Sequence, residues 1–442
     1  MRFDKIYSLV TDSVLPQKDK HYWLYSLPAY DNVQTREELL GDKIESAKYR
    51  VPDKCILFNK LNVRFKRVWR IDNSDKGKLC STEFLPLIVN EDEVDFNYAY
   101  YLLLTDFITK FLAGQNNNTS GSHKRIDPAL FFNIDINLPS KPIQKRIGDF
   151  LFSIDQAIDA CRTIIVTASN LISSYYDYWF LQYDFPSKSN RQPYKTSGGD
   201  MVSCPSLGYN IPKGWKPVQF RKLITINEET VNPFKLGDSI LEHYSIPAYD
   251  ASGCPTFDSA KDILSNKFKV TPEVFLVSKL NPRFKRIWDP LCLTDKAICS
   301  TEFIVCKSLT PAFKPFCFAI ANSHPFHKFL KQHASSSTGS RYRLDPQDIL
   351  KFEVAVPDDD SVINEFNDLC ASCMNLIKAA RLEINTLNEA KTVYLPLLMS
   401  GQIQLSRASQ GAVPIASCRK CGGKHGADLR RLKGEKRKQC KR

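Results

Sequence analysis

The stretch Lys60-Leu-Asn-Val-Arg-Phe-Lys-Arg-Val-Trp69 returns later in the chain as Lys279-Leu-Asn-Pro-Arg-Phe-Lys-Arg-Ile-Trp288, 219 residues further on. Further blocks repeat in the same order: Tyr25–Asp31 as Tyr244–Asp250, Cys80–Phe84 as Cys299–Phe303, and Gly121–Pro128 as Gly339–Pro346. The repeat is far longer than the roughly 20–50 residues of a solenoid repeat. The sequence therefore predicts a duplicated globular domain, which suggests a two-part target that is read twice.

The basic residues of the chain are unevenly placed. The net charge of +13 over 442 residues is typical of a nucleic-acid-binding protein. From Ser406 onward, however, 12 residues are Lys or Arg and 2 are Asp or Glu, so the tail carries +10 and the rest only +3. A DNA-binding surface in the body of the chain must therefore be a local patch.

The composition is that of a globular chain with reduced cysteines. With 43% apolar residues, about three domains with their own cores are expected. No apolar run approaches the roughly 18–20 residues of a membrane span, and the first residues show no signal-peptide pattern. The 14 cysteines are scattered, many of them in apolar runs, which favours a cytoplasmic protein without a disulfide framework.

Strand-like and helix-like segments alternate, which predicts a mixed α/β (α+β) fold. Cys55–Phe58 and Phe84–Val89 are typical of strands, and residues 96–112 are typical of a helix. The expected order is a globular domain (1–140), a long helix (141–185), a flexible linker (186–205), a second globular domain (206–357), a second long helix (358–401), for which Gly401 is a natural stop, and a disordered basic tail (402–442).

Both long helices carry an apolar stripe. The first has Ile143, Ile147, Phe150, Ile154, Ala157, Cys161, Ile164, Ala168, Leu171, Tyr175 and Tyr178; the second has Ile363, Phe366, Cys370, Cys373, Ile377, Ala380, Ile384 and Leu387. Spacing by three and four residues over several heptads predicts a coiled coil, so the two helices can pair with each other. The alternative is two amphipathic helices, each packed on its own domain.

The first cluster of candidate DNA-binding residues is basic and aromatic. It comprises Lys60, Arg64, Lys66 and Arg67, repeated as Lys279, Arg283, Lys285 and Arg286. Arginine can bind phosphate, or the O6/N7 edge of guanine, with two N–H groups at once. The interleaved Phe and Trp can anchor a strand whose basic residues face outward. The alternative is a solvated strand edge, but retention in both copies favours DNA contact.

The second cluster lies in segments rich in small residues, 116–125 and 335–343. Its candidates are Ser122, Lys124 and Arg125 in the first copy and Ser340, Arg341 and Arg343 in the second. Small residues expose backbone N–H groups to phosphates, and the basic residues that follow neutralise them. The glycine and lysine spacing of a nucleotide-binding loop is missing. The alternative is an ordinary flexible loop.

Catalytic motifs are missing from the sequence. There is no Gly-rich cofactor turn, no methyltransferase or nuclease signature and no His-Glu-x-x-His zinc motif. Cys418, Cys421, His425 and Cys440 offer soft ligands, but their spacing matches no zinc finger. We therefore expect a non-catalytic chain without a metal or cofactor of its own.

The repeated motifs resemble those of the specificity (S, HsdS) subunits of Type I restriction-modification systems. The resemblance covers roughly residues 1–405 and is carried by Leu276–Arg283 with Arg286–Trp288, Ser300–Phe303, Thr338–Arg341 with Arg343, and Leu395–Gly401. The first copy lacks the lead Ile211–Trp215, and the basic tail lies outside the family pattern.

This resemblance implies two target recognition domains separated by an antiparallel helical pair. Each domain would recognise one half of a bipartite double-stranded DNA target. Methyltransferase (M) subunits would dock on the helices and supply the S-adenosylmethionine chemistry, and a restriction (R) motor subunit with ATP and Mg²⁺ would join for cleavage. Two alternatives stay open: the recognition part of a fused restriction-modification enzyme, and a coiled-coil scaffold that binds no DNA.

The helical spacer generates the first prediction. Inserting one heptad in each long helix keeps the stripe in register and lengthens the spacer by roughly 10 Å. At about 3.4 Å per base pair, the unspecified gap of the target should grow by about three base pairs, with both half-sites unchanged. Inserting two residues rotates the stripe by about 200° and should disrupt assembly. Mapping methylated sites measures the gap, and an active heptad variant with an unchanged gap would refute the spacer role.

Overall fold

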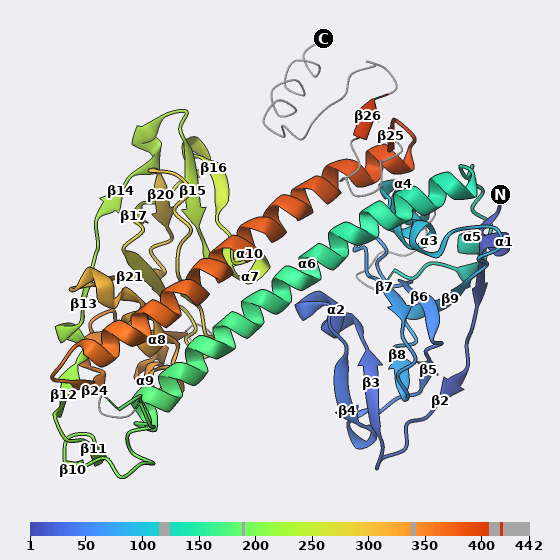
Figure 1. Cartoon of the computed structure of the whole chain (residues 1–442). Helices are drawn as coiled ribbons and strands as arrows, with labels where there is room; N and C mark the ends of the chain where they lie inside the picture. Colours follow the sequence, from blue (N-terminus) through green and yellow to red (C-terminus); the bar gives the residue numbers. More distant parts are fainter. Residues whose placement is uncertain (115–123, 188–190, 337–341, 406–415, 419–442) are drawn as a thin grey trace. The chain divides into compact units, whose positions relative to one another are not determined.

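The computed structural model describes residues 1–114, 124–187, 191–336, 342–405 and 416–418 (Figure 1). The chain divides into two compact units. Unit 1 comprises Met1–Gln156 with Asn388–Arg442, and unit 2 comprises Ala157–Leu387. No helix in the described part of the chain is both long enough and apolar enough to cross a membrane.

Unit 1 combines two sheets with short helices. One sheet has the order β1-β9-β6-β7, with β1 Tyr7–Leu9, β6 Lys54–Asn59, β7 Val68–Asp72 and β9 Phe84–Val89. The other has the order β2-β5-β8-β3-β4, with β2 Ser13–Val14, β3 His21–Tyr25, β4 Glu37–Leu40, β5 Lys48–Arg50 and β8 Lys78–Cys80. The helices include α1 Phe3–Ile6, α2 Leu27–Val33, α3 Phe96–Leu103, α4 Asp106–Gly114 and α5 Pro128–Phe132.

Strand β6 is buried on both faces, which explains its continuous apolar run. Ile56 and Phe58 pack in one core with the residues of α3–α5. Cys55 and Leu57 pack in a second core with Trp69. This division follows the two-residue period of a strand. The two strands predicted from the sequence, 55–58 and 84–89, are confirmed.

The helix predicted over residues 96–112 is interrupted. Helix α3 ends at Leu103 and α4 starts at Asp106. The Thr105 hydroxyl donates to the Leu102 carbonyl at 2.7 Å, and the Thr105 backbone N–H donates to the same oxygen. These local hydrogen bonds replace the regular helical hydrogen bonds for one turn. The apolar pattern continues through both helices, so it does not predict this interruption.

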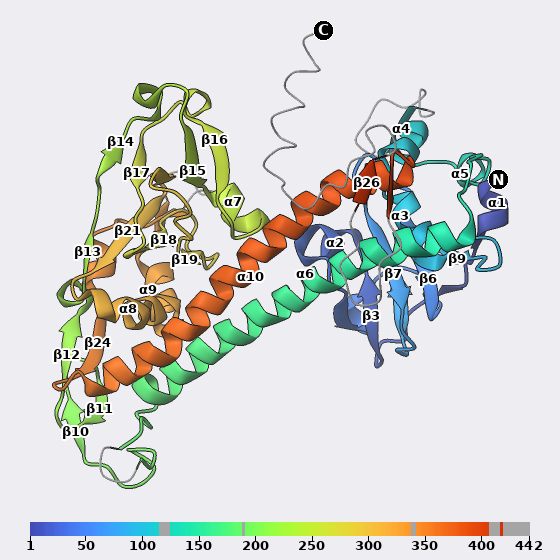
Figure 2. The ribbon, with the colours of Figure 1, turned by 45° about the horizontal axis from the view of Figure 1, so that its top comes forward.

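Unit 2 repeats this architecture (Figures 1 and 2). One sheet has the order β13-β21-β18-β19, with β13 Ile224–Ile226, β18 Val274–Ser278, β19 Ile287–Trp288 and β21 Phe303–Ser308. The other has the order β14-β17-β20-β15-β16, with β14 Thr230–Val231, β15 Ile240–Tyr244, β16 Thr256–Ser259, β17 Lys267–Lys269 and β20 Ala297–Cys299. Its helices include α7 Ile246–Ala251, α8 Lys314–Asn322 and α9 His324–His333.

The two copies share their strand register as well as their strand order. Leu57 pairs with Trp69 in unit 1, and Leu276 pairs with Trp288 in unit 2. Each residue of the second pair lies 219 positions after its counterpart in the first pair, which is the offset of the sequence repeat. The predicted duplication of a mixed α/β domain is therefore confirmed.

The segment expected to be a flexible linker packs on unit 2. The ring of Phe185 stacks on Tyr194 at 4.7 Å and on Trp215 at 5.1 Å. The Asp184 carboxylate accepts hydrogen bonds from the backbone and hydroxyl of Thr196 at 2.7 and 2.6 Å. Next to it, β10 Met201–Cys204 pairs with β11 Tyr209–Pro212, and β12 Trp215–Gln219 pairs with β24 Glu353–Pro357. The Ser, Gly and Pro content did not reveal these aromatic anchors.

Two long helices run through the chain: α6 Lys141–Tyr176, continued by a π-helical turn Asp177–Leu181, and α10 Ser361–Met399. In unit 1 the ring of Phe150 packs on Tyr394 at 5.6 Å, and Lys391 donates to Asp155 at 2.5 and 2.8 Å. In unit 2 Phe180, at the other end of the first helix, packs on Phe366, near the start of α10, at 5.1 Å. The helices therefore run antiparallel in each unit, as the resemblance implies.

The stripe of α10 is confirmed, whereas three of the eleven residues predicted for the stripe of the first helix are exposed. Ile363, Phe366 and Cys370 are buried. On α6 the predicted Ile164, Leu171 and Tyr178 are 42%, 43% and 39% exposed, while Leu151, Ile158, Ile172 and Trp179 are buried. Adjacent apolar pairs such as 171 and 172 both fit a helical period of 3.6 residues. The pattern alone could not choose between them.

Helix α10 ends at the glycine that the sequence indicated. Gly401 adopts a positive φ of 69°, and its backbone N–H donates to Leu398. Beyond it, β25 Ile403–Leu405 pairs with β26 Ala416–Cys418, so this part of the predicted disordered tail is a strand pair. Residues 406–415 and 419–442, with Cys421, His425 and Cys440, lie outside the described residues.

Residue 70 and its counterpart 289 dock their units on the long helices with opposite charges. The Arg70 guanidinium lies over the ring of Phe152 of α6 at 4.2 Å. Asp289, only 8% exposed, pairs with Lys314 at 2.6 Å and with Lys378 of α10 at 2.9 Å. Burial lowers the pKa of Lys314, and the Asp289 carboxylate opposes that shift.

The second prediction tests this buried group. Asp289→Ala leaves the charges of Lys314 and Lys378 without their carboxylate, so the free energy of unfolding should fall by about 3–5 kcal/mol. Denaturant unfolding of the full chain measures it. Asp238→Ala is the control, because Asp238 pairs with Lys261 while 89% exposed, and should change stability by less than about 1 kcal/mol. If Asp289→Ala lowered the free energy of unfolding as little as Asp238→Ala, Asp289 would not be the buried partner of both lysines.

Candidate nucleic-acid interface

The repeated basic stretch forms a tight loop, not the strand that was expected. In unit 1 it connects β6 to β7, and the Asn59 backbone N–H donates to the Arg67 carbonyl across its base at 3.1 Å. Asn62 has a φ of 51° and accepts from the Phe65 N–H at 2.9 Å. Asn281 has a φ of 47° and makes the same turn in unit 2. Asparagine tolerates this left-handed conformation better than most residues, which explains its place in both copies.

The fold brings the two basic clusters together in each unit. In unit 1 the Asn62 N–H donates to the Lys124 carbonyl at 2.7 Å, and the Ile126 N–H donates to the Lys60 carbonyl at 3.0 Å. In unit 2 the Asn281 N–H donates to Tyr342 at 2.7 Å, and the Leu344 N–H donates to Lys279 at 3.0 Å. Loops about 60 residues apart in the sequence therefore form one surface.

Glutamates of the third repeated block position one arginine per unit. Arg125 donates through Nε and Nη2 to the Glu83 carboxylate at 2.7–3.0 Å. Arg343 donates through Nη2 to Glu302 at 2.8 Å. The arginine side chains stay 52% and 56% exposed. The sequence reasoning missed both glutamates, although their recurrence in Ser-Thr-Glu-Phe at the same offset was a signal of a shared partner.

Arg67 and Arg286 are engaged inside their units. Arg67 donates through Nε and Nη2 to both oxygens of Asp31 at 2.6 Å. Arg286 makes the same bidentate pair with Asp250 at 2.7 and 2.8 Å. The arginine side chains are only 15% and 13% exposed. Their geometry is that of anchors for the loop, with little surface left for DNA.

Lys66 and Lys285 also bind within the protein. Lys66 pairs with Asp106 at the start of α4 at 2.5 Å, which lowers the pKa of that carboxyl. Lys285 donates to the Asn322 carbonyl at the end of α8 at 2.5 Å. Burial lowers the pKa of Lys285, and the charge of Asp177 opposes that shift. Both lysines therefore tie the loop to the neighbouring helices.

Other candidates face outward or lie beyond the described residues. Within the described part of the chain, the side chains of Arg64 and Arg283 make no hydrogen bond or ion pair, and each guanidinium lies over a phenylalanine ring, at 5.2 and 4.8 Å. Lys60, Lys124 and Lys279 are half-buried beside them. Ser122, Ser340 and Arg341 lie outside the described residues.

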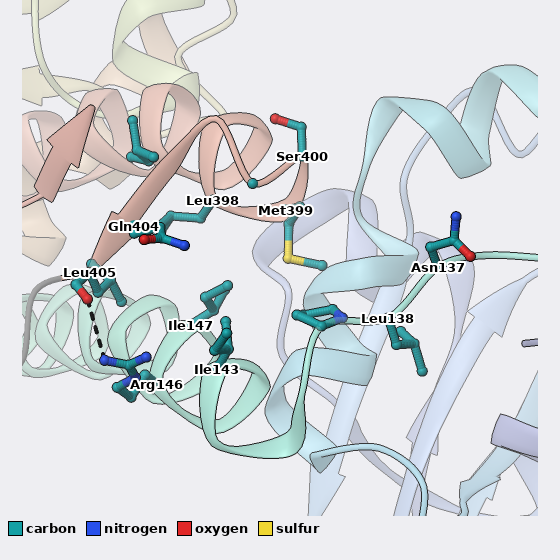
Figure 3. Close-up of a pocket in the computed structure, with 13 residues that line it drawn as sticks. Asn137, Leu138, Ile143, Arg146, Ile147, Leu398, Met399, Ser400, Gln404 and Leu405 are labelled. Carbon is teal, nitrogen blue, oxygen red and sulfur yellow. Dashed lines mark hydrogen bonds between the residues drawn. The ribbon is translucent and has the colours of Figure 1, made fainter. Parts of the chain in front are cut away.

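A hollow in unit 1 is separate from this surface. It measures about 390 Å³ and lies between the start of α6 and the end of α10 (Figure 3). Ile143, Ile147 and Leu398 line it, and Arg146 donates to the Leu405 carbonyl at 3.4 Å at its edge. No candidate DNA-binding residue lines it. Among the described residues, no group of three side chains is placed to hold a metal ion.

Comparisons with known proteins match part of the chain to one family. Residues 16–168 match the family model of the Type I restriction modification DNA specificity domain. The Type I restriction enzyme HindI specificity subunit of Haemophilus influenzae is 22% identical over 138 residues, which is 31% of this chain and 30% of that protein. The matched region therefore spans less than a third of that relative.

One solved structure shares its fold over most of the chain. The S subunit of a Type I restriction-modification system from M. genitalium matches with a TM-score of 0.55 at 12% identity, covering 90% of this chain and 95% of that one. The HsdS subunit from Thermoanaerobacter tengcongensis gives a TM-score of 0.35 at 14% identity over 91% of this chain and 96% of that one. The match to the M. genitalium structure shows that the chain has the fold of that S subunit, and residues 16–168 match the model of the Type I restriction modification DNA specificity domain.

Proposed function

We propose that this chain is the DNA-specificity subunit of a Type I restriction-modification complex. Each unit recognises one half of a bipartite double-stranded target. The observation that carries the proposal is the loop pair built twice, with Arg64 and Arg125 exposed in unit 1 and Arg283 and Arg343 in the same places in unit 2. It occurs in a chain whose residues 16–168 match a DNA specificity domain, which favours DNA over a scaffold role.

The charges of this surface divide into anchors and contacts. Arg125 uses Nε and Nη2 on Glu83, which leaves Nη1 for a phosphate oxygen or a base edge. Arg64 can neutralise a phosphate, since no carboxylate competes for it in the described part of the chain. Arg67 holds the loop in place through Asp31.

We further propose that the chain has no catalytic centre and acts in the cytoplasm. Methyltransferase subunits would dock on the long helices and bring S-adenosylmethionine, and a restriction subunit would bring ATP and Mg²⁺. Exposed apolar side chains on the helices support such docking: Ile164, Val166 and Leu171 on α6 and Leu376 on α10 are 42%, 59%, 43% and 55% exposed. The recognition part of a fused enzyme would make the same DNA contacts, and methyltransferase and motor genes beside this gene would argue against it.

The third prediction separates contacts from anchors. In the assembly with methyltransferase subunits, Arg64→Ala and Arg283→Ala should each weaken DNA binding and reduce the slope of log affinity against log salt by about one unit. Arg67→Ala is the matched control. It should lower the melting temperature, because Asp31 loses its partner, and leave the salt slope unchanged. Salt titrations measure both, and an unchanged slope in folded Arg64→Ala would exclude a phosphate contact.

The fourth prediction concerns the independence of the two readers. Replacing residues 206–357 with the matching domain of a relative should change one half of the methylated sequence and leave the other half intact, because the two units have separate cores. Methylation mapping in cells reports both halves. A replacement that altered both half-sites would contradict the model of two readers.

A further inference from the structure

Each candidate DNA-binding loop presents one phenylalanine to solvent. Phe65 is 51% exposed and Phe284 is 50% exposed. The apolar residues around Phe65 point the other way, since Val63 and Val68 are only 6% and 2% exposed. A ring that stays half exposed in both units leaves apolar surface that a ligand can cover, so its repetition suggests a ligand.

The loop around Phe65 is held on both sides. The backbone N–H of Phe65 donates to the Asn62 carbonyl, and the Phe65 carbonyl accepts from the backbone N–H of Arg67, both at 2.9 Å. The next two side chains are tied down, Lys66 by Asp106 and Arg67 by Asp31. The ring is therefore presented by a preorganised turn and loses little freedom when it binds.

The second unit reaches the same geometry with a different anchor. Lys285 binds the Asn322 carbonyl, where Lys66 binds a carboxylate. In both units two guanidiniums lie about 5 Å from the ring: at 5.2 and 5.0 Å in unit 1, and at 4.8 and 5.1 Å in unit 2. A ring next to an exposed guanidinium suits a base step next to a phosphate.

We propose that Phe65 and Phe284 are wedge residues, each inserting at one base step of its own half-site, with Arg64 and Arg283 on the adjacent phosphates. A phenyl ring has no hydrogen-bond donor or acceptor with which to select one particular base. An apolar wedge can partially unstack any base step, and the free-energy cost depends on how easily that step deforms. Each half-site should therefore prefer a flexible pyrimidine–purine step at the matching position. This inference rests on the proposed function.

The experiment scans 2-aminopurine along both half-sites in duplexes bound to the complete methyltransferase assembly. Emission should rise at one step of each half-site, apart from the base that the methyltransferase flips. Phe65→Ala should abolish the rise in one half-site only, and Phe284→Ala in the other. Each variant should bind about five- to a hundredfold more weakly, the range for a lost aromatic–base stack, and Phe65→Leu should keep part of the signal.

Phe257→Ala is the matched control, because Phe257 is also 50% exposed in unit 2 but lies on β16, outside the loop pair. It should leave emission and affinity unchanged. Emission that persists in Phe65→Ala and Phe284→Ala would overturn the wedge while the proposed function stands. Loss of co-purifying methyltransferase from these variants would make the rings a protein contact and overturn it as well. If the wild-type assembly bound no DNA, the proposed function itself would fail.

Discussion

Bidentate ion pairs between arginine and carboxylate hold the candidate interface in both units. In unit 1 they join Arg67 to Asp31 and Arg125 to Glu83, and their counterparts do so in unit 2. A planar guanidinium that donates two parallel bonds fixes direction as well as distance, which a lysine cannot do. The Arg67 side chain is mostly buried while Asp31 is half exposed, so removing Asp31 would leave the guanidinium without its carboxylate partner. The loops keep their shape because these pairs join segments that are distant in the chain.

The repeat predicted more than the number of domains. Tyr25–Asp31 and Cys80–Phe84 recur with the basic stretch because they supply its carboxylate partners, Asp31 and Glu83. Sequence reasoning located the arginines and treated all of them as available to DNA, since nothing in one chain says which distant blocks meet. Charge placement along a sequence therefore overstates the charge that a folded surface offers.

Other features depend on backbone conformation and side-chain packing, which a residue pattern alone does not predict. Asn62 converts an apparently alternating strand into a loop through one left-handed residue. On α6, Leu171 and Ile172 fit the helical period equally, and packing buries only the second. The linker 186–205 was judged by its small residues, but its Tyr194 stacks on Phe185 and fixes part of it.

The opposite charges at residues 70 and 289 distinguish the two duplicated units, which otherwise share one fold. Arg70 rests on the ring of Phe152, whereas Asp289 is enclosed by Lys314 and Lys378. Were the partners exchanged, the guanidinium would meet two ammonium groups and the carboxylate would meet the electron-rich face of a ring. The two units therefore pack on the long helices through different interactions. The two copies of the repeated domain have in this way lost their internal symmetry where they contact the long helices.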